Sequence, residues 1–114
     1  MFSYPDDLMG VPHDKDCSFL QWSKGDAKVV FSYKAKGTQS DFVLDCHFAA
    51  NKKALRHIRQ AINEFCSIMF EHDRCLAICA AVKRSSVERL VKKCGFTKFG
   101  VSTGENINVY ARLR

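Results

Sequence analysis

Long apolar runs are missing from this 114-residue sequence, and no stretch approaches the roughly 20 residues of a membrane-spanning helix. The acidic, proline-containing start MFSYPDDLMG lacks the basic and apolar regions of a signal peptide. Repeats, low-complexity tracts and linkers are also absent, and both prolines lie within residues 1–16. We therefore expect a cytoplasmic protein with no membrane partner. Residues 1–16 should form a loosely ordered lead-in, and residues 17–114 a single domain.

The six cysteines do not indicate a disulfide framework, because no secretion signal accompanies them. Cys46, Cys66, Cys75 and Cys79 lie inside apolar patterns, which predicts reduced core residues. Within one strand, Cys75 and Cys79 would stand about 13 Å apart, too far to share a zinc ion. We predict no metal site.

The net charge of +6 favours polyanionic partners over basic ones. Basic residues gather near two predicted helix starts, which would either form an anion site or simply be solvated helix faces. Nucleic acid is not favoured, since most aromatic residues fall in core patterns instead of alternating with exposed cations. The two clusters comprise Lys52, Lys53, Arg56 and Arg59, and then Lys83, Arg84, Arg89, Lys92 and Lys93.

The first half of the domain predicts an antiparallel meander of three strands, Cys17–Ser23, Ala27–Ala35 and Asp41–Ala49, joined by glycine-containing turns. The third strand alternates strictly, so Asp45 and His47 share the face opposite its large apolar residues. A carboxylate beside an imidazole can act as a general base, but the same pattern fits a half-exposed polar face.

A long amphipathic helix follows, capped by Asn51 and running to about His72. Its predicted apolar stripe comprises Leu55, Ile58, Ala61, Ile62, Phe65, Cys66, Met69 and Phe70.

The segment Cys75–Phe99 reads as a buried strand, a short helix and a second strand. Ser85 should cap the helix together with Glu88, and Gly95 should end it in the left-handed conformation. The turn Gly104-Glu105-Asn106 and the strand Ile107–Leu113 complete the chain. The order strand, strand, strand, helix, strand, helix, strand, strand predicts an α/β (α+β) mixed sheet, in which the helical crossover leads to a parallel neighbour.

The helix sequence SSVERLVKKCGF, residues 85–96, resembles the segment Asn-x-x-Ala-x-x-Leu-Tyr-x-Lys-x-Gly-Phe of GNAT (Gcn5-related N-acetyltransferase) proteins. The element order over roughly residues 17–113 is also similar to that family's core. This resemblance implies acetyl-coenzyme A held between the splayed strands Asp41–Ala49 and Cys75–Val82. The pyrophosphate would then lie at the helix start at Asn51, where free N–H groups favour an anion.

The resemblance implies the following site residues. Pantetheine would pair with the strand carrying Leu44, Cys46 and Phe48, and the phosphates would meet Asn51, Lys52, Lys53, Ala54, Arg56 and Arg84. An active enzyme would use Asp45 or His47 to assist deprotonation of the amine. In place of the family's usual tyrosine it would need Tyr110, Cys79 or a solvent proton as the acid.

Two departures from the family pattern bear on catalysis. The phosphate loop usually reads Gln/Arg-x-x-Gly-x-Gly/Ala, and here Ala54 and Arg56 fill the glycine positions. The usual tyrosine, which often protonates the leaving thiolate, falls on Val91, which cannot donate a proton.

Two functions therefore stay open. One is an N-acetyltransferase acting on an unknown amine or protein acceptor. The other is a non-catalytic binding domain that resembles the small GNAT-like proteins of bacteriophages, some associated with virion or head assembly. Besides acetyl-coenzyme A and the acceptor, the candidate partners are an assembly protein and a second copy of this chain.

Overall fold

The structure is a computed structural model that describes residues 1–38, 40–82, 85–102 and 107–114. Arg84 and the predicted turn Gly104-Glu105-Asn106 lie outside the described residues. The described elements are β1 (Phe2–Ser3), β2 (Ser18–Lys24), β3 (Ala27–Gly37), β4 (Phe42–Ala50), η1 (Lys52–His57), α1 (Ile58–Phe70), β5 (Cys75–Val82), α2 (Ser85–Lys93), β6 (Thr97–Ser102) and β7 (Ile107–Leu113).

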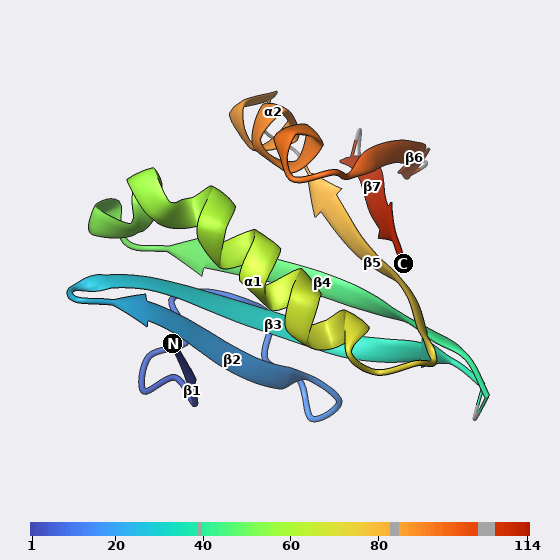
Figure 1. The fold of residues 1–114 in the computed structure, drawn as a ribbon, viewed down its shortest axis with the longest axis horizontal. Coiled ribbons are helices and arrows are strands. Elements are labelled where there is room, and N and C mark those ends of the chain that lie inside the picture. The colour runs from blue at the N-terminus through green and yellow to red at the C-terminus, as the bar shows by residue number, and fades with distance from the viewer. Residues whose placement is uncertain (39, 83–84, 103–106) are drawn as a thin grey trace.

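The strands form one seven-stranded sheet in the order β1-β2-β3-β4-β5-β7-β6 (Figure 1). β4 and β5 pair in parallel, and the other described neighbours pair antiparallel. The predicted mixed sheet, with its antiparallel meander and parallel pair, is confirmed. No helix in the described part of the chain is long and apolar enough to cross a membrane.

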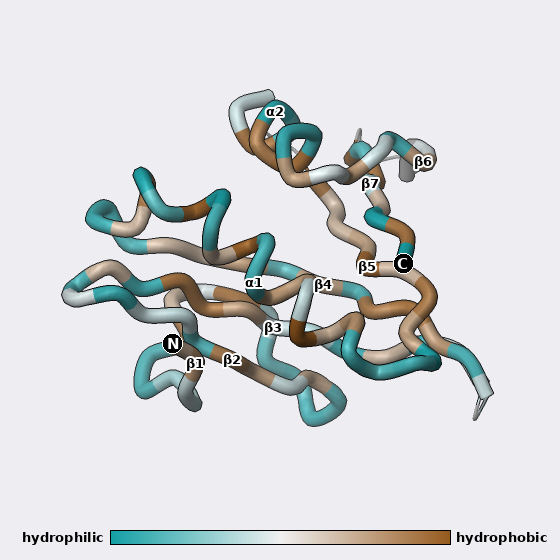
Figure 2. Tube along the Cα trace, viewed as in Figure 1, coloured by the Kyte–Doolittle hydropathy of each residue, from teal (hydrophilic) through white to brown (hydrophobic). Residues whose placement is uncertain are grey.

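The core lies between the sheet and α1, which crosses the face of β3 and β4 (Figure 1). The Phe65 ring stacks on Phe31 of β3 with centroids 4.2 Å apart. The buried residues of α1 are Ile58, Ala61, Ile62, Phe65 and Cys66. Hydrophilic and hydrophobic residues alternate along this helix (Figure 2). The helical periodicity therefore predicted correctly which side of α1 is buried.

The start of this helix differs from the prediction, because residues Lys52–His57 form a 3₁₀ helix and the α-helix begins only at Ile58. A 3₁₀ helix turns by 120° per residue instead of 100°, so the two segments present different faces to the core. Leu55, predicted to belong to the apolar stripe, is consequently 62% exposed, whereas Ala54 is fully buried.

The N-terminal lead-in is more ordered than the sequence predicts. Phe2 and Ser3 pair with β2 as the edge strand β1. Val11 is buried, and the Ser32 hydroxyl donates to the carbonyl of Pro12. The lead-in therefore lies against β3 at Ser32, which is buried.

Helix α2 ends as predicted. Gly95 has φ +87°, its N–H donates to Lys92, and the Phe96 N–H donates to Val91, which together form a Schellman motif. The start differs: the Glu88 carboxylate accepts from the Asn108 amide and the Tyr110 hydroxyl of β7 instead of closing a capping box. Tertiary partners on β7 have replaced the local partner that the sequence indicated.

Candidate functional site

The parallel strands β4 and β5 separate part-way along their length. Their pairing ends at Cys46 and Ala80, yet β4 continues to Ala50 and β5 to Val82. Figure 1 shows the arrowheads of the two strands diverging. This fork opens a gap in the sheet and leaves backbone groups on its two inner edges without a strand partner.

A cleft of about 470 Å³ occupies the fork. His47 and Phe48 both line it although adjacent residues of a strand point to opposite faces, so the cleft reaches both faces of the sheet. The full lining is Cys46, His47, Phe48, Ala80, Ala81, Val82, Val87 and Ile107. An extended ligand could lie there with its backbone-like amides paired to the strand edges.

A groove of about 490 Å³ adjoins the cleft on the sheet face that carries Asp45. Asp45 and His47 both line this groove, so the structure brings the two predicted base candidates to one hollow. Lys36 Nζ lies 3.1 Å from the Asp45 carboxylate. Burial raises the pKa of the neighbouring Cys79 thiol, and the Asp45 charge adds to that rise, so Cys79 stays protonated.

Tyr110 lies elsewhere, since it is fully buried and its hydroxyl donates to Glu88 Oε2 at 3.1 Å. It lines neither the cleft nor the groove. The pKa of the Glu88 carboxyl is lowered most by the hydrogen bond from Asn108, and also by the one from Tyr110. The Tyr110 hydroxyl therefore donates its hydrogen bond to an ionised carboxylate. The geometry favours a structural role for this tyrosine.

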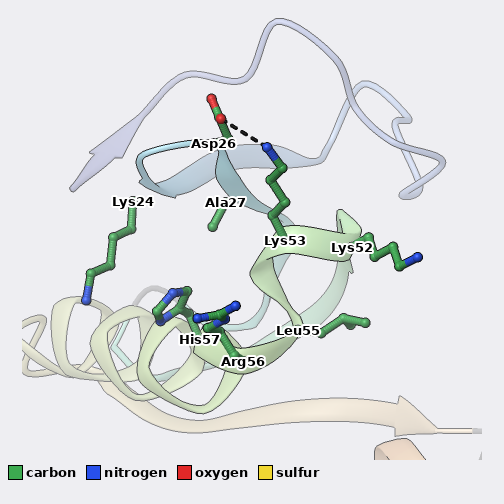
Figure 3. A pocket seen from close by; sticks show the side chains of 8 residues that line it. All are labelled: Lys24, Asp26, Ala27, Lys52, Lys53, Leu55, Arg56 and His57. Atoms are coloured by element: carbon green, nitrogen blue, oxygen red, sulfur yellow. Dashed lines mark hydrogen bonds and ion pairs between the residues drawn. The ribbon is translucent and has the colours of Figure 1, made fainter.

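Three of the predicted phosphate residues, Lys52, Lys53 and Arg56, line a separate basic pocket of about 630 Å³, next to the turn between β2 and β3. Its cations are Lys24, Lys52, Lys53 and Arg56, and Lys53 pairs with Asp26 at 3.1 Å. Figure 3 shows Lys53 reaching toward Asp26 while Lys52 points away from that pair. The pocket shares no lining residue with the cleft.

Asn51 organises this corner. Its Oδ1 accepts from the Ala54 N–H at 3.1 Å and from the Lys28 N–H at 3.0 Å, and its Nδ2 donates to Asp26. The side chain thus satisfies one N–H that an anion would otherwise use, and the short 3₁₀ segment has a smaller aligned dipole than the long α-helix we expected. The Ala54 methyl faces the core, so it does not cover the outer surface of the turn.

The structure therefore brings some of the residues predicted for the cofactor site to the fork and places others elsewhere. Cys46, His47 and Phe48 line the fork, whereas Leu44 is buried in the paired part of β4. Five residues line the cleft that sequence patterns did not predict as site residues: Ala80, Ala81, Val82, Val87 and Ile107. The available signal was the run of small residues in β5, which leaves room beside a strand.

No family model and no curated protein matches this chain. Among solved structures, a point mutant of spermidine N-acetyltransferase SpeG from Vibrio cholerae superposes with a TM-score of 0.68 at 15% identity, over 89% of this chain and 68% of the other. A chimera of SpeG from Vibrio cholerae and hSSAT gives 0.67 at 14%, over 89% and 69%. A GNAT-family acetyltransferase from Bacillus anthracis gives 0.54 at 14%, over 76% and 65%.

These similarities show that the chain has the fold of GNAT acetyltransferases. They agree with the resemblance drawn from residues 85–96. The relation to bacteriophage proteins stays a prediction.

Proposed function

We propose that this chain is an N-acetyltransferase that moves an acetyl group from acetyl-coenzyme A to an amine. The observation that carries the proposal is the fork, where β4 and β5 separate beyond Cys46 and Ala80 around a cleft of about 470 Å³. Shared fold alone does not establish chemistry, whereas this cleft and the groups beside it are features that the reaction needs.

The cleft suits the pantetheine arm of the cofactor. That arm is a chain of two amides, and the inner edge of β4 beyond Cys46 offers backbone donors and acceptors to such a chain. The cleft walls are otherwise largely apolar, as a ligand site that excludes water requires.

The phosphates would be held mainly by charge. Lys52, Lys53 and Arg56 follow β4 directly, and all three are exposed. Because Asn51 already uses the Ala54 N–H, we assign the attraction chiefly to these side chains, aided by the first free N–H groups of the 3₁₀ turn.

The acceptor amine would approach through the groove that holds Asp45 and His47. Its nitrogen attacks the thioester carbonyl carbon, the new C–N bond forms, the C–S bond breaks, and coenzyme A leaves as a thiolate. His47, or Asp45 through water, takes the proton that the amine loses. We assign the thiolate proton to solvent, because burial raises the pKa of the Cys79 thiol and makes it a weaker acid.

The second candidate is a GNAT-like domain that binds a protein without catalysis. The buried Val91 favours it, because this position has no hydroxyl to protonate a thiolate. Such a domain would fit the predicted resemblance to bacteriophage assembly proteins, and its partner would be a protein.

Calorimetric titration with acetyl-coenzyme A and with coenzyme A, at low and moderate salt, separates the two. Micromolar binding that survives moderate salt supports the proposal, and acceptor amines can then be screened for transfer. Absence of binding, or binding that moderate salt abolishes, overturns the cofactor site and leaves the protein-binding domain.

A double variant tests the phosphate assignment. Lys52→Glu with Lys53→Glu should weaken coenzyme A binding by about tenfold or more, since two attractive charges become repulsive. Lys15→Glu with Lys98→Glu is the matched control, because it changes the net charge equally at residues that line none of the hollows described above. Equal loss in both variants would refute a local phosphate site.

A further inference from the structure

Lys36 of β3 places an amine inside the groove that holds Asp45 and His47. Its Nζ lies 3.1 Å from the Asp45 carboxylate. The groove adjoins the fork cleft, since several residues, His47 and Ala80 among them, line both hollows. The chain therefore carries an amine of its own in the hollow that we propose for the acceptor.

The Lys36 side chain is directed along the sheet toward the fork. In the register of β3 with β4, Lys36 stands opposite Val43. Its ion-pair partner Asp45 stands opposite Lys34, two residues further along β4 in the direction in which β4 and β5 separate. Lys34 pairs instead with Asp14 of the lead-in at 3.3 Å, and it lines neither the groove nor the cleft. Of these two lysines on one strand face, Lys36 is the one that reaches toward the proposed reaction centre.

The Lys36 ammonium lies close to the point where the strands separate. Asp45 is the register partner of Cys79 in β5, one residue before the pairing of the two strands ends. Burial first and the Asp45 charge second raise the pKa of the Cys79 thiol, and the Lys36 charge lowers it, so both charges act on this thiol. His47, where the fork begins, is about 7 Å further along the strand than Asp45.

The ion pair of Lys36 with Asp45 can open at little cost. The Lys36 side chain is 60% exposed and that of Asp45 is 30% exposed, and ion pairs in contact with water are weak. Lysine carries its ammonium on a flexible four-carbon chain, so Nζ can turn from Asp45 toward His47. Opening is required for reaction, because an ammonium nitrogen has no free electron pair and cannot attack a thioester.

We propose that Lys36 is a self-acetylation site, which takes the acetyl group from acetyl-coenzyme A held in the fork of the same molecule. The inference rests on the proposed function, because it requires the thioester to lie beside His47. An amine attached to the groove has an effective concentration on the order of millimolar or higher, so it reacts before a dilute free amine does.

The transfer step follows from the groups in the groove. The Lys36 ammonium gives one proton to His47, which later passes it to solvent. The neutral Nζ attacks the thioester carbonyl carbon, the C–N bond forms, the C–S bond breaks, and coenzyme A leaves as a thiolate. The nitrogen loses its second proton to solvent as the amide forms, and solvent protonates the thiolate. The acetylated side chain is neutral, so Asp45 loses its cation.

The test is incubation of the full chain with acetyl-coenzyme A that carries a ¹³C-labelled acetyl group, followed by peptide mass spectrometry. Lys36 should be labelled at least about tenfold faster than Lys34, which lies on the same strand face and is also ion-paired. The Lys36 rate should saturate as the concentration of acetyl-coenzyme A rises. Dilution of the protein at a fixed concentration of acetyl-coenzyme A should leave this rate unchanged, because the reaction occurs within one molecule.

Two variants assign the label to one side chain. Lys36→Arg keeps a cation for Asp45 and removes the reactive amine, so the chain should lose its fast label. Lys34→Arg is the matched control, and it should keep the fast label because Lys34 lines neither hollow.

The outcomes separate this inference from the function on which it rests. Equal labelling of Lys36 and Lys34, a Lys36 rate that does not saturate, or a rate that falls on dilution overturns self-acetylation. If calorimetry shows that acetyl-coenzyme A binds and free amines are acetylated, the proposed function stands despite that failure. Failure of acetyl-coenzyme A to bind overturns both. Fast, saturable labelling that Lys36→Arg removes and Lys34→Arg retains supports the inference.

Discussion

Gly95 offers a direct test of how the second helix is built. The residue has φ +87°, a region that alanine and valine rarely adopt, and it holds the Schellman motif that ends α2. A Cβ added at Gly95 would meet only the Arg112 side chain, at 3.7 Å from Nε, which is ordinary contact. The cost of Gly95→Ala is therefore backbone strain without steric overlap.

The strain in a left-handed alanine is roughly 1–2 kcal/mol. Unfolding entropy near 2.1 cal/mol/K per residue gives about 240 cal/mol/K for a chain of this length, so Gly95→Ala should lower Tm by about 4–8 °C. Gly95→Val should lower it further, since a β-branched residue is a stronger outlier at positive φ.

Thermal unfolding followed by circular dichroism or calorimetry measures this loss. Gly100→Ala is the matched control: Gly100 is outside the positive-φ region and a Cβ there meets nothing within 4 Å. Its Tm should stay level or rise, because alanine reduces the entropy of the unfolded chain. A Tm for Gly95→Ala within about 1 °C of the native value would refute the reasoning, as would an equal loss in Gly100→Ala.

Three further predictions follow from single side chains. Asn51→Ala removes the hydrogen bonds that join the β2–β3 turn to η1, and should cost about 1–2 kcal/mol in a denaturant titration; no shift in the midpoint would contradict this role. Tyr110→Phe should leave any acetyl transfer rate within about twofold, whereas loss of a catalytic acid would cost about 10²–10⁴-fold. The Glu88 carboxyl has a pKa below its ordinary 4.5, so its stabilising effect is present above that pH and is lost as the pH falls through the folded-state pKa. The Tm difference between the native protein and Glu88→Gln, measured from pH 7 to pH 3, should become smaller in acid. A difference that stays constant would contradict a stabilising role for the Glu88 carboxylate.

The order of elements could be predicted from local patterns. The alternation in Phe42–Ala50, the helical stripe from Ile58 to Phe70 and the stop at Gly95 all match the structure. Each depends on residues close together in the chain, so it is visible in the sequence.

The structure differs from the sequence prediction where a 3₁₀ helix replaces an α-helix and where residues distant in the chain form hydrogen bonds. The 3₁₀ turn exposed Leu55, because the periodicity that predicted its burial assumes an α-helix. Glu88 accepts hydrogen bonds from Asn108 and Tyr110 instead of capping its own helix. These two residues lie near Glu88 only because β7 pairs with β5.

By itself, the sequence determined the kinds of elements, their succession and the apolar face of each, because propensity, capping and periodicity act over a few residues. Only the tertiary structure decided where β4 and β5 part, since that depends on the pairing of two strands that α1 separates in the chain. The fork brought His47 and Phe48 of β4 and Ala80 and Ala81 of β5 to one cleft, whereas Tyr110 is buried away from it. A site assembled across the sheet has no local signature, because its residues become neighbours only when the strands pair.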